Sequence, residues 1–198
     1  MKFIYDNINN YSDKEYENFL SIIKKEKQNK IFNILKQDDK KRSILGEILL
    51  IKLLSDLNIN YKSIDIYKNK YGKPYIKNRE LYFNISHSKD FVVCTISNNK
   101  IGIDIEQIRE ANDSIIKQFA TNKEIEYINQ NQKYYNKRCF EIFTLKESYF
   151  KCLGTNLNHI KKIEFELNDK TIKSSNNKFH FTLINNIDNY IIAICEER

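Results

Sequence analysis

A helical apolar pattern in residues 39–58 restricts the fold more than any other feature of the sequence. Ile44, Ile48 and Ile51 recur at helical spacing within DKKRSILGEILLIKLLSDLN. This spacing is typical of a buried amphipathic helix. Asp39 stands at the start of the segment, where an N-cap is expected. One long buried helix is therefore predicted in the N-terminal part of the chain.

Segments on both sides of this helix add further helices and strands. A short strand is expected at residues 2–5, and one or two helices at 12–36. From residue 63 onward apolar residues alternate in short runs, which is typical of strands, and helical patterns return at 122–135 and 138–153. The alternating runs are IDIY, LYFNIS, FVVCTIS, IGIDIE, KIEFEL, FHFTLI and YIIAICEE. This order predicts an α+β protein with helices and strands in each half.

The composition allows a substantial core and offers no sign of a membrane span. The chain has 198 residues, of which 41% are hydrophobic, enough for one large domain or two small halves that share a core. No stretch approaches the roughly 20 apolar residues of a membrane helix, and MKFIYDNINN lacks the apolar run of a secretory signal. The four cysteines form no CxxC pair. A cytoplasmic protein with reduced cysteines is expected.

The formal net charge of +7 leaves two interpretations open. A positive field attracts anionic partners such as acidic proteins or nucleic acids. Lys, Asn and Ile are abundant along the whole chain, however, so the excess charge also agrees with an ordinary solvated surface.

The run IGIDIE at 101–106 is the first candidate for chemistry. Strand alternation places its three isoleucines on one face and Gly102, Asp104 and Glu106 on the other. Residues two apart on a strand are separated by roughly 6.5–7 Å, close enough for two carboxylates to bind one cation. The competing interpretation is a half-exposed strand whose acidic side chains face water.

The helix predicted at 138–153 supplies a third acid. Apolar residues surround nearly its whole circumference, so it should be largely buried. Glu147 shares a face with Phe140 and Phe143, and Lys151 follows one turn later. Because a buried unpaired charge costs several kcal/mol, Glu147 should meet either Lys151 or a cation.

Glycine and proline are scarce, with four glycines and one proline in the chain. The placement of one glycine and the only proline in Gly72-Lys73-Pro74 indicates a loop of defined shape that can approach a nucleotide. Ser86-His87-Ser88 follows an alternating run and is expected in a turn, where its side chains can hydrogen-bond phosphate oxygens. The alternative for His87 is an ordinary surface histidine.

Together these motifs resemble the 4′-phosphopantetheinyl transferases of the surfactin-synthetase-activating type. The resemblance covers residues 25–155, in five motifs that follow the order and spacing of the family. They are Arg42-Ser43-Ile44-Leu45-Gly46, Tyr71-Gly72-Lys73-Pro74, Phe83-Asn84-Ile85-Ser86-His87-Ser88, Ile101-Gly102-Ile103-Asp104-Ile105-Glu106 and Lys146-Glu147-Ser148-Tyr149-Phe150-Lys151. The chain departs from the family at Phe143, where a tryptophan is frequent, and the match is patchy beyond residue 160, which leaves carrier selectivity open.

The resemblance implies two similar α+β halves in one chain, with the active site in the cleft between them. We place the boundary at Asn99. The N-terminal half, 1–99, would contain the coenzyme A nucleotide-binding loops. The C-terminal half, 100–198, would contain the metal carboxylates and the catalytic helix.

The resemblance also implies residue roles. Asp104, Glu106 and Glu147 would bind Mg²⁺, or Mn²⁺ in its place, and Glu147 and Lys151 would act in catalysis with Glu147 as the base. Coenzyme A would contact Lys27, Lys30, Arg42, Gly72, Lys73, Pro74, Ser86, His87, Ser88 and Lys151. Glu124 falls where family members carry another acid, and a solvated helix residue is its alternative.

The implied reaction is attack by a serine hydroxyl of an apo acyl or peptidyl carrier protein on the β-phosphate of coenzyme A, with release of 3′,5′-ADP. The enzyme would be a holo-[acyl-carrier-protein] synthase type transferase, a monomer without nucleic-acid or membrane partners. Two other functions remain open. One is a Mg²⁺-dependent hydrolase that uses the same carboxylates, and the other is a nucleic-acid-binding module, which the charge of +7 and the 13 tyrosines suggest.

Overall fold

The computed structural model describes residues 1–158, 160–168 and 171–198. The first half contains, in order, β1 (Lys2–Asn7), η1 (Ile8–Asn10), α1 (Asp13–Ile22), α2 (Lys25–Phe32), α3 (Gln37–Ser55), η2 (Tyr61–Ser63), β2 (Ile66–Lys68), β3 (Pro74–Ile76), β4 (Tyr82–Ser88) and β5 (Phe91–Ser97). The second half contains β6 (Ile101–Gln107), α4 (Asp113–Phe119), α5 (Asn122–Asn129), η3 (Gln132–Tyr134), α6 (Tyr135–Leu153), η4 (Ile160–Lys162), β7 (Phe165–Leu167), β8 (Ile172–Ser174), β9 (Phe179–Ile184) and β10 (Tyr190–Glu197).

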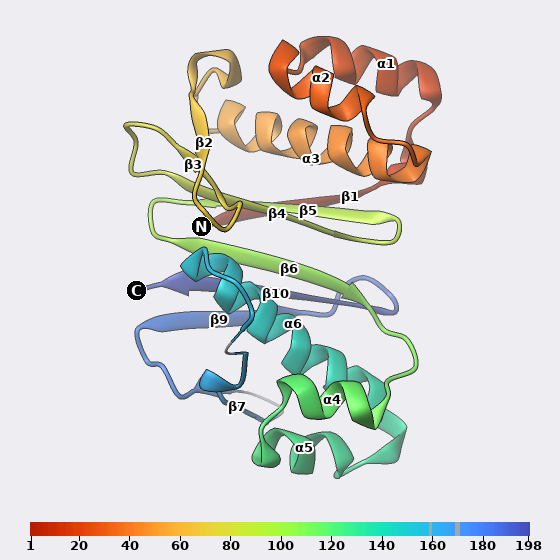
Figure 1. Ribbon diagram of the computed structural model, residues 1–198, viewed down its shortest axis with the longest axis vertical. Coiled ribbons are helices and arrows are strands. Elements are labelled where there is room, and N and C mark those ends of the chain that lie inside the picture. The colour runs from red at the N-terminus through yellow and green to blue at the C-terminus, as the bar shows by residue number, and fades with distance from the viewer. Residues whose placement is uncertain (159, 169–170) are drawn as a thin grey trace.

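Two three-stranded antiparallel sheets form the middle of the molecule, with strand orders β1-β5-β4 and β6-β10-β9. Helices α1, α2 and α3 lie above the first sheet in Figure 1, α4 and α5 lie below the second, and α6 runs obliquely along the second sheet and contacts β6 and β10. Two short hairpins, β2–β3 and β7–β8, complete the strands. Helices therefore cover the outer side of each sheet, and the sheets face each other.

Three apolar clusters hold these layers together. One lies between α3 and the first sheet, and another surrounds α6 and the second sheet. The third joins the two sheets, where Val93 of β5 packs with Ile101, Ile103 and Ile105 of β6. Because side chains alternate along a strand, burial of these isoleucines between the sheets directs the other face of β6 toward α6.

The two sheets also meet along β4 and β6 through side chains. Asn84 Oδ1 accepts the backbone N–H of Ile103 at 2.8 Å. Four residues further along β4, Ser88 Oγ accepts the backbone N–H of Gln107 at 3.1 Å. These side chains satisfy backbone donors of β6 that a continuous sheet would pair with carbonyl groups.

The predicted long helix is present as α3, but its start differs from the prediction. Lys36 is the N-cap residue and makes no side-chain capping bond. Asp39 lies inside the first turn, where its carboxylate accepts a hydrogen bond from Arg42 Nη2 at 2.5 Å. The expectation that Asp39 caps the helix was therefore wrong, because the helix begins two residues earlier, at Gln37.

Two other regions differ from the sequence prediction. β4 continues to Ser88, so His87 lies near the end of a strand and the turn begins at Lys89, whose φ is +50°. The seven-residue helix α4 had no sequence prediction, since two turns are too short for a clear apolar period. No helix in the described ranges is long and apolar enough to cross a membrane.

Candidate active site

Strand β6 and helix α6 bring the candidate acids together because the helix lies directly on the strand. A Cβ added at Gly102 would lie 2.8 Å from the backbone carbonyl carbon of Lys151. Such a distance is too short for any side chain larger than hydrogen, so glycine permits the close approach. The same face of β6 presents Asp104 and Glu106, and α6 presents Glu147 and Lys151.

Asp104 lies at the centre of this site and is only 2% exposed. Its Oδ1 accepts hydrogen bonds from Ser86 Oγ at 2.9 Å and from Lys151 Nζ at 2.5 Å. Lys151 Nζ also donates to Ser86 Oγ at 2.9 Å. Residues from β4, β6 and α6 therefore converge on one carboxylate oxygen. The other oxygen, Oδ2, is buried and has no hydrogen-bond partner.

Glu106 extends the site along β6 and is half-buried. Its Oε2 accepts a hydrogen bond from Ser88 Oγ at 3.1 Å and lies 3.2 Å from Arg109 Nη1. Burial raises the pKa of Glu106, and the neighbouring charge of Asp104 raises it further. Two negative side chains therefore face the same space.

Glu147 is the third acid, and the structure does not pair it with Lys151. No hydrogen bond or ion pair links its carboxylate to another described residue, whereas Lys151 is bound to Asp104. Burial raises the pKa of Glu147 to about 7, and the charge of Asp104 adds to this effect. Burial opposes the charge on Lys151, but Asp104 outweighs it and raises the pKa of Lys151.

These features suit a divalent cation. A buried carboxylate oxygen without a partner is costly, and Asp104 Oδ2 is such an atom. Asp104 also raises the pKa of both other acids, which shows that the three carboxylates repel one another. Among the described residues, no three acidic, histidine or cysteine side chains already form a cluster tight enough to hold a metal. A cation here would therefore need further oxygen ligands, which hard cations such as Mg²⁺ accept from phosphates.

Arg42 and His87 lie near each other, and the His87 ring also lies near Lys151. Arg42 lies on α3 and donates from Nη1 to the carbonyl of Lys89 at 2.6 Å. The pKa of His87 is lowered because its ring is partly shielded from water and because the cations of Arg42 and Lys151 lie nearby. One cation from each half, Arg42 and Lys151, thus lies near the His87 ring.

Lys27 and Lys30 lie on α2, and the structure does not bring them to the carboxylates. Lys27 Nζ forms an ion pair with Glu47 of α3 at 2.9 Å. Tyr61 Oη donates to the other oxygen of Glu47 at 2.7 Å. Lys30 is exposed and makes no ion pair with any described residue.

The loop Gly72-Lys73-Pro74 has the defined shape that its composition predicts. Gly72 has φ +87°, a conformation that favours glycine, and Pro74 begins β3. The ammonium of Lys73 is buried and donates to the backbone carbonyls of Ile101 at 2.9 Å and Cys152 at 2.8 Å. In this conformation it contacts the chain itself and not the space beside the carboxylates.

Three residues of the site were not singled out from the sequence. Asn84 bonds β4 to β6, Arg109 contacts Glu106, and Asn69 shapes the loop before Lys73. Asn84 could have been found from the sequence, because it alternates with Ser86 and Ser88 along the strand. These three polar residues therefore share one strand face. Arg109 and Asn69 lie in segments without such a period.

Glu124 is buried, which excludes the solvated alternative for this residue. Its side chain is 0% exposed and its Oε2 lies 2.8 Å from Lys146 Nζ, which is also 0% exposed. Its Oε1 accepts the backbone N–H of Phe165 at 2.9 Å. The pair connects α5 to α6 and to β7, away from the three carboxylates.

Two family models match the chain and together cover residues 10–195. One is described as the 4′-phosphopantetheinyl transferase superfamily and matches residues 100–195, and the other as 4′-phosphopantetheinyl transferase, N-terminal, matching residues 10–99. The chain belongs to the 4′-phosphopantetheinyl transferase superfamily. The expected α+β fold with two similar halves agrees with this membership.

Relatives within the 4′-phosphopantetheinyl transferase superfamily are close in sequence. The 4′-phosphopantetheinyl transferase gsp of Aneurinibacillus migulanus is 42% identical over 159 residues, which is 78% of this chain and 66% of the relative. The 4′-phosphopantetheinyl transferase Sfp of Bacillus subtilis (strain 168) is 30% identical over 149 residues, which is 74% of this chain and 66% of the relative. The chain thus spans just under two thirds of these relatives.

A weaker overlap exists with a solved structure, the holo-[acyl-carrier-protein] synthase of Thermotoga maritima. The TM-score is 0.43 at 22% identity, over 50% of this chain and 64% of that chain. This overlap is too small to assign roles to residues.

Proposed function

We propose that the protein transfers the 4′-phosphopantetheine group of coenzyme A to a serine hydroxyl of an apo acyl or peptidyl carrier protein and releases 3′,5′-ADP. The observation that carries this proposal is the convergence of Asp104, Glu106, Glu147 and Lys151 where the two halves meet, in a chain of this superfamily. The half at 1–99 would bind the nucleotide, and the half at 100–198 would supply the acids.

Asp104, Glu106 and Glu147 would hold a Mg²⁺ ion, for which Mn²⁺ could substitute, together with diphosphate oxygens of coenzyme A. A bound Mg²⁺ would act as a Lewis acid that stabilises negative charge on the diphosphate. The unpartnered Oδ2 of Asp104 supports its role as a ligand.

Glu147 would accept the serine proton. A general base must lie within hydrogen-bond reach of the proton that it accepts, and Glu147 is available for this because no hydrogen bond or ion pair links its carboxylate to another described residue. The serine oxygen forms a bond to the β-phosphorus, and the bond from this phosphorus to the bridging oxygen breaks. Lys151 lies beside Asp104 and would offset charge on the departing 3′,5′-ADP.

The remaining contacts with coenzyme A would come from the N-terminal half. Arg42 would bind phosphate together with His87, whose ring lies near both Arg42 and Lys151. Ser86 and Ser88, which bond Asp104 and Glu106, would orient the site. The backbone of the Gly72-Lys73-Pro74 loop would line the adenine. Lys27 would reach the nucleotide only if it leaves Glu47, whereas the exposed Lys30 would need no such change.

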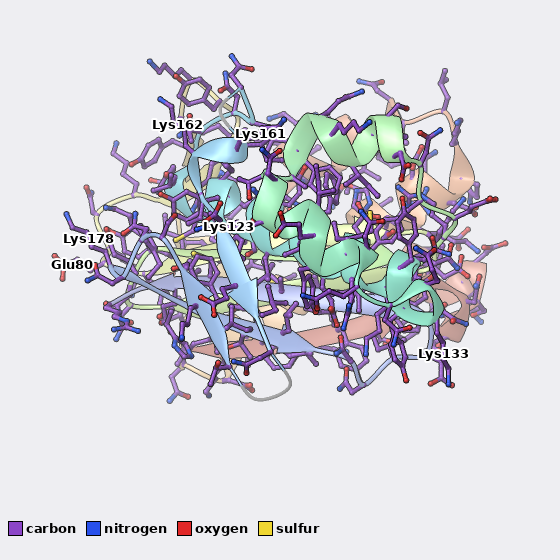
Figure 2. All side chains as sticks on the ribbon, turned by 90° about the horizontal axis from the view of Figure 1, so that it is seen from below. Glu80, Lys123, Lys133, Lys161, Lys162 and Lys178 are labelled. Carbon is purple, nitrogen blue, oxygen red and sulfur yellow. The ribbon has the colours of Figure 1, made fainter. Side chains whose placement is uncertain are left out.

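The carrier protein would approach as an anionic partner, for which the net charge of +7 is suited. Nucleic acid and membrane have no part in this proposal, and the protein would act as a cytoplasmic monomer. Figure 2 shows Lys161 and Lys162 next to each other on one side of the face that it views, with Lys123 and Lys178 on that side too, and Lys133 alone at the opposite side. Lys133 is thus separated from the others, and these lysines do not form a stripe along the whole face, as a nucleic-acid site typically does.

The decisive experiment incubates the protein with coenzyme A, Mg²⁺ and a panel of apo carriers from fatty-acid, polyketide and nonribosomal-peptide synthesis. We expect mass spectrometry to show a gain of one phosphopantetheine on at least one carrier. Breakdown of coenzyme A without carrier modification would instead support hydrolysis, and salt-sensitive binding to RNA without any transfer would support a nucleic-acid module.

Asp104→Asn and Glu147→Gln test whether the two carboxylates are required for transfer. Both changes keep the size of the side chain, so the fold should persist while transfer falls by about 10²–10⁴-fold. Glu80→Gln is the matched control, because Glu80 is an exposed acid elsewhere on the surface (Figure 2). Circular dichroism checks the fold of each variant. Near-normal turnover in both site variants would refute the assignment.

A further inference from the structure

The C-terminal end of α6 is bound by side chains from the other half of the molecule. The last carbonyls of a helix have no partner within the helix. Cys152 O accepts a hydrogen bond from Lys73 Nζ at 2.8 Å, and Gly154 O accepts one from Asn69 Nδ2 at 2.7 Å. We call these bonds the hairpin contact, because Asn69 and Lys73 belong to the turn between β2 and β3.

Lys73 also binds the beginning of β6. The same ammonium donates to Ile101 O at 2.9 Å. Ile101 precedes Asp104 by three residues, and Cys152 directly follows Lys151. One buried ammonium therefore connects the strand that carries Asp104 with the helix that carries Lys151.

The hairpin turn is itself well ordered by local hydrogen bonds. Asn69 Oδ1 accepts the backbone N–H groups of Tyr71 and Lys73, each at 3.0 Å. A Cβ added at Gly154 would lie 2.9 Å from Lys73 Cδ and 3.0 Å from Asn69 Nδ2. The turn thus packs against the helix end and does not merely reach it with one long side chain.

The contact between α6 and β6 explains why the bonds from Lys73 are needed to hold the two elements in place. At Gly102 the helix backbone lies on the strand without an intervening side chain. Interdigitating side chains are what normally fix the position of one element along another, and they are missing at this point. The ammonium of Lys73 supplies a fixed point at the ends of both elements, and a cation at a helix C-terminus is also favourable for the helix dipole.

We propose that Lys73 and Asn69 are positioning residues, which set the place of Lys151 and Glu147 relative to Asp104, and that the Lys73 ammonium does not bind coenzyme A. This inference rests on the proposed transferase function. For Lys73 to reach a phosphate, its ammonium would have to leave two carbonyl groups unpaired in a buried place, which is unfavourable.

Two variants remove the hairpin contact in different ways. Lys73→Met keeps most of the aliphatic chain and removes the donor. Asn69→Asp keeps Oδ1 for the turn and replaces the donor to Gly154 O with a carboxylate oxygen, which repels that carbonyl. Lys70→Met is the matched control, because Lys70 is in the same turn and its ammonium lies over the exposed ring of Tyr71.

Steady-state kinetics with a competent apo carrier separates positioning from ligand binding. A displaced catalytic helix lowers kcat, so we expect kcat to fall by about 10- to 100-fold in both variants. The KM for coenzyme A should rise by a smaller factor than kcat falls, since Lys151 and Glu147 are displaced but no ligand of the coenzyme is removed. Lys70→Met should match the wild type. A rise of about 10-fold or more in KM for coenzyme A with normal kcat, or normal values of both constants, would overturn the proposal.

Hydrogen exchange tests the same contact without any turnover. The amides of Gly154 and Thr155 donate to Phe150 O at the end of α6, and they should exchange faster in both variants but not in Lys70→Met. If the wild-type protein modifies no carrier, the transferase function fails, and this measurement still decides whether the hairpin contact holds α6. Unchanged exchange of these amides in both variants would overturn the proposal that the hairpin contact holds α6. If Lys73→Met does not fold, Asn69→Asp decides the outcome by the same criteria.

Discussion

At the scale of single residues, Asp104 shows how burial and charge are combined in the candidate site. One oxygen is bonded to Ser86 and Lys151, and the other is buried without a partner. An arrangement of this kind costs stability unless a ligand completes it. Residues that break local rules in this way are concentrated at functional sites, which agrees with the proposed metal ligands.

Lys73 gives a residue-scale prediction about pH. Burial lowers the pKa of Lys73 to about 8, below its ordinary value of 10.5. Between these two values the unfolded chain holds a proton that the folded protein has released, so stability rises with pH in this window. We expect the wild type to gain stability over Lys73→Met from pH 8 to 10, on the order of 1 kcal/mol per pH unit.

Urea unfolding at several pH values measures this difference. Titration of the tyrosines is common to both proteins and cancels in the comparison, whereas Cys152, whose pKa is lowered by a hydrogen bond with Cys195 and by the charge of Lys73, is replaced by serine in both proteins. A difference between wild type and Lys73→Met that stays constant from pH 8 to 10 would show that Lys73 keeps an ordinary pKa in the folded protein.

At the scale of elements, the close contact between β6 and α6 determines the site. Gly102 permits this contact because any Cβ there would meet the backbone of Ser148 and Lys151. Backbone atoms cannot rotate away as the end of a side chain can, so α6 itself would have to move.

Gly102→Ala is therefore expected to destabilise the protein by about 1–3 kcal/mol and to lower transfer activity by displacing Glu147 and Lys151. Gly46→Ala in α3 is the matched control. Its Cβ would lie 3.1 Å from Cγ2 of Ile85, a side chain that can adjust, and alanine favours the helix by about 1 kcal/mol.

Urea unfolding and the carrier-modification assay measure both variants. The net change in stability for Gly46→Ala should stay within about 1 kcal/mol. Equal losses of stability in the two variants would contradict the special role of Gly102.

At the scale of the whole molecule, the two halves are joined by a continuous apolar layer and by polar bonds along β4 and β6. Val93 packs with the isoleucines of β6, and Asn84 binds the backbone of Ile103. Neither half can bury these groups by itself, so separation would expose apolar surface and unpaired backbone donors.

We therefore expect one cooperative unfolding transition for both halves. Leu49→Ala in the first core should cost about 2–5 kcal/mol, since Leu49 is 1% exposed. It should reduce hydrogen-exchange protection in β10 as well as in β5. Loss of protection confined to the first half, or two transitions in calorimetry, would show that the halves unfold separately.

Sequence patterns by themselves determined the elements and the identity of the acids. The alternation in IGIDIE placed Asp104 and Glu106 on one face, and the apolar circumference of residues 138–153 predicted the buried helix that carries Glu147. Both predictions follow from the repeat of side-chain directions along a strand or a helix, which is visible in the spacing of nearby residues. The order of the motifs, through a family resemblance, indicated the function class.

Only the tertiary structure decided which groups meet. Lys151 pairs with Asp104 and not with Glu147, Glu124 is buried with Lys146, and Lys73 binds carbonyls that lie 28 and 79 residues away in the chain. Contacts at such separations depend on how the sheets and helices pack, because a charged side chain can accept any of several partners of similar chemistry. The packing of α6 on β6 at Gly102, and the hairpin turn at its end, select one of them.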